Sequence, residues 1–236
     1  MPGDPVPAGA PQSAPAGSLA LLHTSPAHIP VFDALRDTDH PGLDLRHLVA
    51  GELLTRARRE GPDAVADDVR ALLGEAVAAG ARAVLCTCST IGAVAERAPA
   101  GVPVLRVDRP MAAAAVATGP RIVVLATVAS TLEPTVALVE EEARRAGRSV
   151  DVRTVLVDGA FALFEAGDTD GCARLVAVAA DRVTDADVIV LAQASMTPAQ
   201  ALATTTIPVL SSPRPGLAAA AIAGSVVVVG ASQRQP

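Results

Sequence analysis

Short runs of aliphatic and β-branched residues alternate with longer helical patterns along most of this 236-residue chain. The runs predict seven strands, at Leu19–Leu22, Ala83–Cys86, Val104–Val107, Ile122–Leu125, Val152–Val157, Val188–Leu191 and Pro208–Leu210. The segments between them have helical periodicity, and in Asp63–Ala79 the apolar residues fall on one stripe. Strands that alternate with helices of this length pair in parallel and are covered on both faces, so we predict an α/β fold.

Composition narrows the chemistry that such a fold could carry. The sequence has no Lys, Asn, Tyr or Trp. Without Lys, a Schiff base to a pyridoxal cofactor, a phosphate-binding Walker lysine and a Ser–Lys dyad are all excluded. A net charge of −6 and an aromatic content of 1% argue against nucleic acid as a partner. Proton transfer must therefore rest on Cys, His, Asp and Glu.

Three features bear on where the chain works. Residues 1–17 are rich in Pro, Ala and Gly and carry no basic residue, so we expect a disordered tail rather than a signal peptide. Polar residues and prolines interrupt the uncharged stretch from Val188 to Pro213, which predicts no membrane span. Three cysteines do not make a disulfide framework. We therefore expect a cytoplasmic protein that does not interact with membranes.

The order of elements repeats once along the chain. In the first half a strand at Leu19–Leu22 is followed by helices and by a second strand that leads into Cys88; in the second half Ile122–Leu125 and Val188–Leu191 lead in the same way into Gln193. A turn that bears hydroxyl groups follows the first strand of each half. Ligands of open α/β sheets bind at the carboxyl ends of the strands, so the four turns should converge on one cleft.

Cys88 lies where an apolar strand ends and a helix can begin. The unpaired N–H groups of a helix N-terminus favour a thiolate, so this position suits a reactive cysteine better than a structural one. Cys86 precedes it within the strand and should belong to the core, and Cys172 should pack within an amphipathic helix. Because no second Cys or His pair accompanies Cys86 and Cys88, we predict no metal site.

The residues around Cys88 resemble a known family. Cys88-Ser89-Thr90 resembles the first Cys-Asn-Thr motif of the aspartate/glutamate racemase superfamily, with Ser89 in place of Asn, and Arg121–Thr127 resembles its central strand and threonine turn. The superfamily includes amino-acid and hydantoin racemases, maleate isomerase and arylmalonate decarboxylase. The resemblance extends over about residues 19–224.

The resemblance implies a fold and its division into domains. The fold it implies has two Rossmann-like lobes with parallel sheets, related by a pseudo-twofold, with the active-site cleft between them and no cofactor. Residues 18–118 together with 209–236 would form the N-terminal lobe, and residues 119–208 the second lobe.

One departure from the family pattern is informative. Racemases of this superfamily have a second cysteine after the second-half strand, where this chain has Gln193, and a glutamine accepts no proton near neutral pH. A single thiol could still protonate an enolate after loss of carbon dioxide, or add to a double bond and permit cis–trans isomerisation. His23 occupies the position where glutamate racemases have an acidic residue, and it would supply a second base if it reached Cys88.

We therefore predict a cofactor-independent enzyme that acts next to the carboxylate or carbonyl of a small acid. The alternatives are a decarboxylase of a malonate-like acid, a non-catalytic carboxylate-binding protein and a Cys–His hydrolase. The sequence leaves open the substrate and the oligomeric state, including whether the protein is a homo-oligomer. The expected catalytic residues are Cys88 and His23.

The expected substrate-binding residues are donors from the turns at the strand ends. Thr127, Ser130 and Thr131 could bind an anion, or could only cap the helix that the capping-box sequence Ser130–Glu133 predicts. Gln193 could donate to a carboxylate or only cap its strand, and the resemblance favours the first. The full predicted set is Thr24, Ser89, Thr90, Thr127, Ser130, Thr131, Gln193, Ala194 and Ser195.

Overall fold

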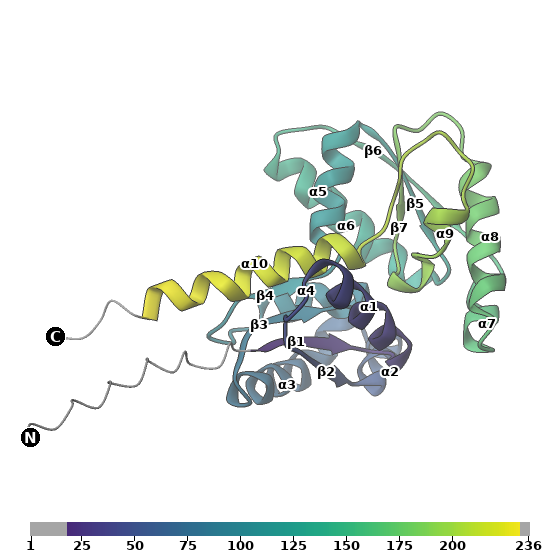
Figure 1. The fold of residues 1–236 in the computed structure, drawn as a ribbon. Coiled ribbons are helices and arrows are strands. Elements are labelled where there is room, and N and C mark those ends of the chain that lie inside the picture. The colour runs from purple at the N-terminus through teal and green to yellow at the C-terminus, as the bar shows by residue number, and fades with distance from the viewer. Residues whose placement is uncertain (1–17, 232–236) are drawn as a thin grey trace, which may run out of the picture.

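The computed structural model describes residues 18–231, with side chains from residue 18 to residue 225, and has two α/β lobes (Figure 1). The tail predicted at residues 1–17 lies outside the described residues. The strand order is β2-β1-β3-β4 in the first sheet and β6-β5-β7-β8 in the second. Every strand pair is parallel. The predicted α/β fold is confirmed, and its two sheets share one topology.

The first lobe is built on the earlier four strands. They are β1 (Ser18–His23), β2 (Leu45–Val49), β3 (Ala81–Cys86) and β4 (Val104–Arg106). The helices around them are α1 (Ile29–Asp39), α2 (Gly51–Glu60), α3 (Ala66–Ala78) and α4 (Ser89–Arg97), with short 3-10 turns η1 (Pro26–His28) and η2 (Pro62–Val65).

The second lobe repeats this plan. Its strands are β5 (Arg121–Ala126), β6 (Asp151–Leu156), β7 (Val188–Leu191) and β8 (Val209–Leu210). The helices of the second lobe are α5 (Arg109–Thr118), which precedes β5, α6 (Leu132–Arg145), α7 (Ala160–Glu165), α8 (Thr169–Asp181) and α9 (Ala199–Leu202), with 3-10 turns η3 (Ala129–Thr131) and η4 (Ala194–Met196). The last helix, α10 (Pro213–Ala231), follows β8 and returns to the first lobe.

The central strands are apolar along their whole length because both faces of each sheet are covered. Leu22 and Val84 of the first sheet face the core under α2, α3 and α4, whereas Leu21 and Leu85 face the opposite core, which contains Phe32 of α1. The second sheet is covered in the same way, with α5 and α6 on one face and α8 on the other. Burial on both faces explains why these strands are continuous hydrophobic runs.

The packing differs from the expected domain limits at two places. Met111 and Ala115 of α5 pack in the core of the second sheet, so this helix belongs with the second lobe although it precedes residue 119. Val209–Leu210 pairs with β7, so the chain returns to the first lobe only after Leu210. Apart from these two places, the predicted division into residues 18–118 with 209–236 and residues 119–208 stays a prediction.

The returning helix α10 lies along the first lobe and contacts α1, β1, β3 and β4 (Figure 1). Its approach depends on Gly216. A Cβ atom at this position would lie 2.5 Å from the carbonyl oxygen of Val107, so only glycine permits the helix to pack this closely.

Two interactions hold the lobes together beside the strand ends. Arg109, at the start of α5, forms ion pairs with Glu96 of α4 and with Glu141 and Glu142 of α6. The hydroxyl of Ser89 donates to the carbonyl oxygen of Ala192 at 2.8 Å. The turns that end β3 and β7 are therefore in direct contact.

Two local expectations differ from the structure. The strand β2 escaped prediction because Arg46 and His47 interrupt its apolar pattern, as is common for a strand at a sheet edge. The capping box at Ser130–Glu133 does not form: the Ser130 hydroxyl has no hydrogen-bond partner and α6 has no side-chain cap, while the Thr131 hydroxyl donates to the carbonyl oxygen of Val128 at 2.6 Å.

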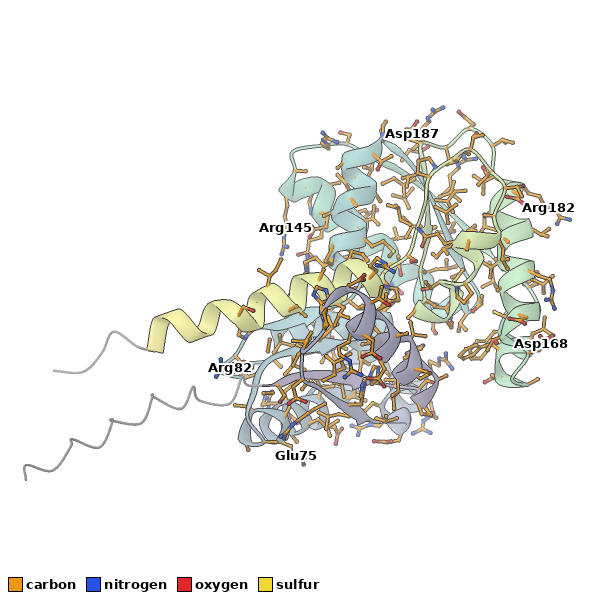
Figure 2. All side chains as sticks on the ribbon, in the orientation of Figure 1. Glu75, Arg82, Arg145, Asp168, Arg182 and Asp187 are labelled. Atoms are coloured by element: carbon orange, nitrogen blue, oxygen red, sulfur yellow. The ribbon has the colours of Figure 1, made fainter. Side chains whose placement is uncertain are left out.

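The outer surface is charged where the helices face solvent. Figure 2 shows Glu75 of α3 and Arg182 at the end of α8 pointing away from the sheets, and both residues are exposed. Within residues 18–231, no helix is long and apolar enough to cross a membrane.

Candidate active site

A cavity of about 570 Å³ lies between the two lobes, at the carboxyl ends of the strands. The first lobe lines it with the turns after β1 and β3 and with α2, and the second lobe with α7, the start of α8 and the turn after β7. The lining residues are Thr24, Ser25, Ala27, His28, Gly51, Leu54, Thr55, Arg58, Thr87, Cys88, Ser89, Thr90, Thr131, Phe161, Phe164, Glu165, Gly167, Thr169, Gln193, Ala194 and Ser195.

Cys88 is the only cysteine that lines this cavity. It has extended backbone at the N-cap position of α4 and is 8% exposed. The first N–H groups of a helix have no intrahelical partners, so the start of α4 presents donors beside the sulfur atom. Cys86 is fully buried, and burial raises the pKa of its thiol far above the usual range. The thiol with access to a ligand is therefore that of Cys88.

Gln193 occupies the same position in the second lobe as Cys88 in the first. The main-chain N–H groups of Thr87 and Ala192 donate to Leu22 and Leu125 respectively, and these leucines are equivalent in the two sheets. The residues that follow, Cys88 and Gln193, thus end matching strands.

The amide of Gln193 has a defined orientation. Its Oε1 atom accepts hydrogen bonds from the main-chain N–H of Thr127 at 2.7 Å and from the Thr127 hydroxyl at 3.0 Å. A main-chain N–H can only donate, so the atom it contacts must be the carbonyl oxygen of the amide. The NH₂ group is consequently the part of Gln193 left to donate to a ligand.

His23 does not reach Cys88. Its ring is completely buried, with Nδ1 2.8 Å from the hydroxyl oxygen of Thr87 and Nε2 2.8 Å from Nδ1 of His47. Burial, together with His47 and His28, lowers the pKa of His23 to about 3. Both ring nitrogens have partners other than the thiol, so the condition under which His23 would supply a second base is not met in the structure.

The histidine that lines the cavity is His28. It lies in η1, and its Nδ1 atom is buried without a hydrogen-bond partner. Burial also lowers the pKa of His28, which favours the neutral imidazole. The position of His28 on the cavity wall could not be predicted from the sequence, because a histidine in a turn is more often a surface or capping residue.

Most of the predicted binding residues meet at the cavity, but two do not. Thr127 and Ser130 are not among the lining residues. Thr127 acts through Gln193 instead, and the Ser130 hydroxyl is buried without a partner. Those that line the cavity are Thr24, Ser89, Thr90, Thr131, Gln193, Ala194 and Ser195.

The cavity wall also contains residues that the sequence did not indicate. The guanidinium carbon of Arg58, on α2, lies 5.4 Å from the ring centre of Phe161 on α7, so a cation–π contact spans the two lobes. Phe164 stacks on Phe161. Two of the three phenylalanines of the chain therefore line one cavity, and the rarity of aromatic residues in the sequence could have drawn attention to them.

Among residues 18–231, no three His, Cys, Asp or Glu side chains are close enough together to hold a metal ion. The cavity wall instead brings together the thiol of Cys88 and the amide of Gln193.

Comparison with known families agrees with the two-lobe arrangement. Residues 22–227 match the model of the Asp/Glu/Hydantoin racemase family. The chain belongs to the Asp/Glu/hydantoin racemase family. No curated protein sequence matches the chain.

Solved structures show the fold of this family in several enzymes. Glutamate racemase RacE1 of Bacillus anthracis has a TM-score of 0.62 at 15% identity, over 92% of this chain and 83% of that one. Aspartate racemase of Picrophilus torridus has a TM-score of 0.63 at 14% identity, over 93% and 96%. A variant of arylmalonate decarboxylase has a TM-score of 0.60 at 21% identity, over 88% and 93%. The likeness at these identities is one of fold.

Proposed function

We propose that this member of the racemase family is a cofactor-independent enzyme that acts on the carbon next to the carboxylate or carbonyl of a small acid. Cys88 is its single catalytic thiol. Membership of the family and the similar folds of racemases and a decarboxylase support the reaction class. The cavity volume of about 570 Å³ is that of a small-molecule site.

The observation that carries the proposal is the position of Cys88 at the N-terminus of α4, on the wall of a cavity shared with Gln193. A carboxylate placed there can accept hydrogen bonds from the NH₂ group of Gln193 and from main-chain N–H groups at the start of α4. The hydroxyls of Thr24 and Thr90 add further donors along the wall. The reacting carbon would then lie next to the sulfur atom.

A site with one thiol favours reactions in which a single group acts on carbon, either as a nucleophile or as a proton donor. In an isomerisation, the Cys88 thiolate adds to a double bond conjugated with the carboxylate, and the electron pair moves onto the carboxylate as an enolate. Rotation follows, the pair returns, and the carbon–sulfur bond breaks. The charge develops beside the donors, where it is stabilised.

Decarboxylation is the second candidate. Gln193 favours it because a glutamine accepts no proton, so the position that matches Cys88 in the second lobe supplies no second base. The carbon–carbon bond to the departing carbon dioxide breaks, and its electron pair becomes an enolate held by the remaining carboxylate. The Cys88 thiol then gives its proton to carbon and takes another from solvent. Racemisation by two bases would instead need a second proton carrier on the wall, and the candidates there besides Cys88 are His28 and Glu165.

The test is proton NMR in deuterium oxide with amino acids, hydantoins, maleate and substituted malonates, comparing the natural chain with Cys88→Ser. We expect exchange, isomerisation or decarboxylation of at least one compound that is lost in Cys88→Ser and kept in Cys172→Ala, whose thiol is buried in α8. Binding of a panel member without any turnover would identify a carboxylate-binding protein and contradict the proposal.

A further inference from the structure

A chain of polar side chains runs from the surface of α1 to the wall of the cavity. Asp33 Oδ1 lies 3.3 Å from Nε2 of His47, whose Nδ1 is 2.8 Å from Nε2 of His23. The other ring nitrogen of His23, Nδ1, is 2.8 Å from the hydroxyl oxygen of Thr87. Thr87 lines the cavity next to Cys88. The surface end is accessible, because the side chain of Asp33 is 38% exposed and that of His47 is 15% exposed.

This chain of hydrogen-bonded side chains has no counterpart in the second lobe. The residues equivalent to His23 and Thr87 are Ala126 and Ala192, and both are buried in the second-lobe core. The same strand pairing therefore forms without buried polar groups at these positions. A buried polar network that the topology does not need is a candidate for a role in the site.

The donors and acceptors of these four side chains permit two arrangements of the hydrogen bonds between them. The Asp33 carboxylate only accepts, so Nε2 of His47 carries a proton in both. When His47 is neutral, its Nδ1 accepts from Nε2–H of His23, and Nδ1 of His23 accepts the hydroxyl proton of Thr87. The Thr87 hydroxyl is then committed to the histidine.

When His47 takes up a second proton, its bond to His23 and the bond from His23 to Thr87 both reverse, while the bond from His47 to Asp33 keeps its direction. Nδ1–H of His47 now donates to Nε2 of His23, so His23 carries its own proton on Nδ1 and donates it to the oxygen of Thr87. The Thr87 hydroxyl keeps its proton and can now donate it to another acceptor. Its protein acceptor is the carbonyl oxygen of Leu22, at 3.2 Å, and a carboxylate in the cavity competes for it.

The charges around the chain place the added proton on His47. On its own face, His47 contacts Asp33 of α1 and His23 of β1, and Asp33 also pairs with Arg36 of α1 at 3.3 Å. His28 of η1 has its ring 6.2 Å from that of His23 and is held neutral by burial.

Helix α10 adds no unpaired charge near His47. Its one charged residue with described side chain, Arg214, is paired with Asp39 of α1. His23 stays neutral because burial and the neighbouring histidines disfavour its charged form. His47, beside a carboxylate and partly exposed, is the group that can accept the proton.

We infer that Asp33, His47 and His23 are positioning residues that turn the Thr87 hydroxyl into a donor for a carboxylate beside Cys88 when His47 is protonated. The inference rests on the proposed function, because it requires a carboxylate in that place. It makes the recognition of acids at Cys88 dependent on a proton bound at the far end of the chain.

Two alkylating reagents test this directly. Iodoacetate and iodoacetamide both form a carbon–sulfur bond with the Cys88 thiolate as iodide leaves, but only iodoacetate carries a carboxylate. The ratio of their rates at Cys88, divided by the ratio for glutathione at the same pH, cancels the ionisation of the thiol. We expect this normalised ratio to exceed one and to rise about tenfold as the pH falls from 8.5 to 5.5.

Variants separate the parts of the chain. The rise should disappear in His47→Gln and in Thr87→Val, which keeps the shape of the side chain. In Asp33→Asn, a mild change near the surface, its midpoint should move to lower pH because the carboxylate that favours the imidazolium is gone. His40→Gln, at the end of α1, is the matched control and should behave as the natural chain.

Nitrogen-15 NMR of the histidine rings gives a second readout that needs no ligand. His23 should change from the Nε2–H tautomer to the Nδ1–H tautomer as the pH falls, and this change should be lost in His47→Gln. A His23 that keeps one tautomer between pH 9 and pH 5, or a rise that survives in Thr87→Val or depends on His28 instead, overturns the inference.

The outcomes also separate the inference from the function on which it rests. A normalised ratio above one at every pH, without a step, overturns the proton-linked chain and leaves carboxylate recognition at Cys88 intact. A normalised ratio of one at every pH overturns both.

Discussion

The two lobes share a strand order and a pattern of burial, yet the turns at their strand ends carry opposite chemistry. In the first lobe β3 ends in Thr87, Cys88 and Ser89; in the second, β7 ends in Ala192, Gln193 and Ala194. The first set has a thiol and two hydroxyls, and the second has an amide between two methyl groups. The backbone arrangement therefore does not fix the chemistry, which the side chains of the two turns determine separately.

The difference assigns separate tasks to the two lobes. Proton carriers of the first lobe, Cys88 and His28, line the cavity, and all four histidines of the chain lie in this lobe. The second lobe contributes a fixed donor, because Thr127 holds the carbonyl oxygen of Gln193. Under the proposed function, the first lobe supplies the thiol that reacts and the second lobe supplies a donor to the carboxylate, with Glu165 of α7 also on the cavity wall.

Removing the reactive side should have the largest effect. Cys88→Ser replaces the thiol by a hydroxyl that does not ionise near neutral pH, so we expect kcat/KM for any substrate found in the NMR panel to fall about 10³-fold. Cys172→Ala should retain full activity. Steady-state kinetics give the comparison, and circular dichroism verifies the fold. Retained activity in Cys88→Ser would remove the asymmetry between the lobes.

Reversing the binding side should have the next largest effect. Gln193→Glu keeps an oxygen for Thr127 to bind but puts negative charge where the NH₂ group donates, so we expect the Kd of a carboxylate ligand to rise about 100-fold. Gln193→Ala, which removes the donor without adding charge, should raise it about tenfold. Calorimetric titration measures both. Equal, small effects would mean that Gln193 only caps its strand.

The sequence revealed the fold better than it revealed the site. Strands buried on both faces, such as Val188–Leu191, are continuous apolar runs and are recognisable without a structure. The edge strand Leu45–Val49 is not, because it is only partly buried and contains Arg46 and His47. Missing that strand also hid the contact of His47 with His23, since the two residues meet only when β1 and β2 pair.

The residues predicted for the site reach the cavity where local sequence determines their position, and other lining residues could not be predicted. Cys88, Ser89 and Gln193 directly follow strands, so their place at the sheet end could be predicted. Arg58 and Phe161 lie within helices of different lobes, and only the packing of the lobes brings them to one cavity. His23 ends a strand as predicted, but its side chain is buried against Thr87 because the strand pleat directs it into the first lobe.

The concentration of histidines in the first lobe predicts acid sensitivity. The unfolded chain protonates His23 at its ordinary pKa of 6.5, whereas burial lowers the folded value to about 3. Below pH 6.5 the unfolded state therefore binds the extra proton, and stability should fall by about 1.4 kcal/mol per pH unit as the pH drops toward 3. This contribution is fully present above pH 6.5.

Urea unfolding between pH 7.5 and pH 4.5 measures this slope. Circular dichroism is the suitable probe because the chain has no Trp or Tyr. His23→Gln should flatten the dependence relative to the natural chain, and His40→Gln should not. If the two variants have the same slope, burial does not lower the pKa of His23, and the prediction of acid sensitivity is wrong.

The smallest expected effect concerns the bond that joins the two turns. Ser89→Ala removes the hydroxyl that donates to the carbonyl oxygen of Ala192, and alanine is the residue already present at the equivalent Ala194 of the second lobe. The loss should cost about 1 kcal/mol and lower the Tm by about 3 °C. Ser225→Ala is the matched control, since its exposed hydroxyl bonds only within α10, to Ala221. A smaller loss in Ser89→Ala than in the control would mean that the contact of the turns does not depend on this bond.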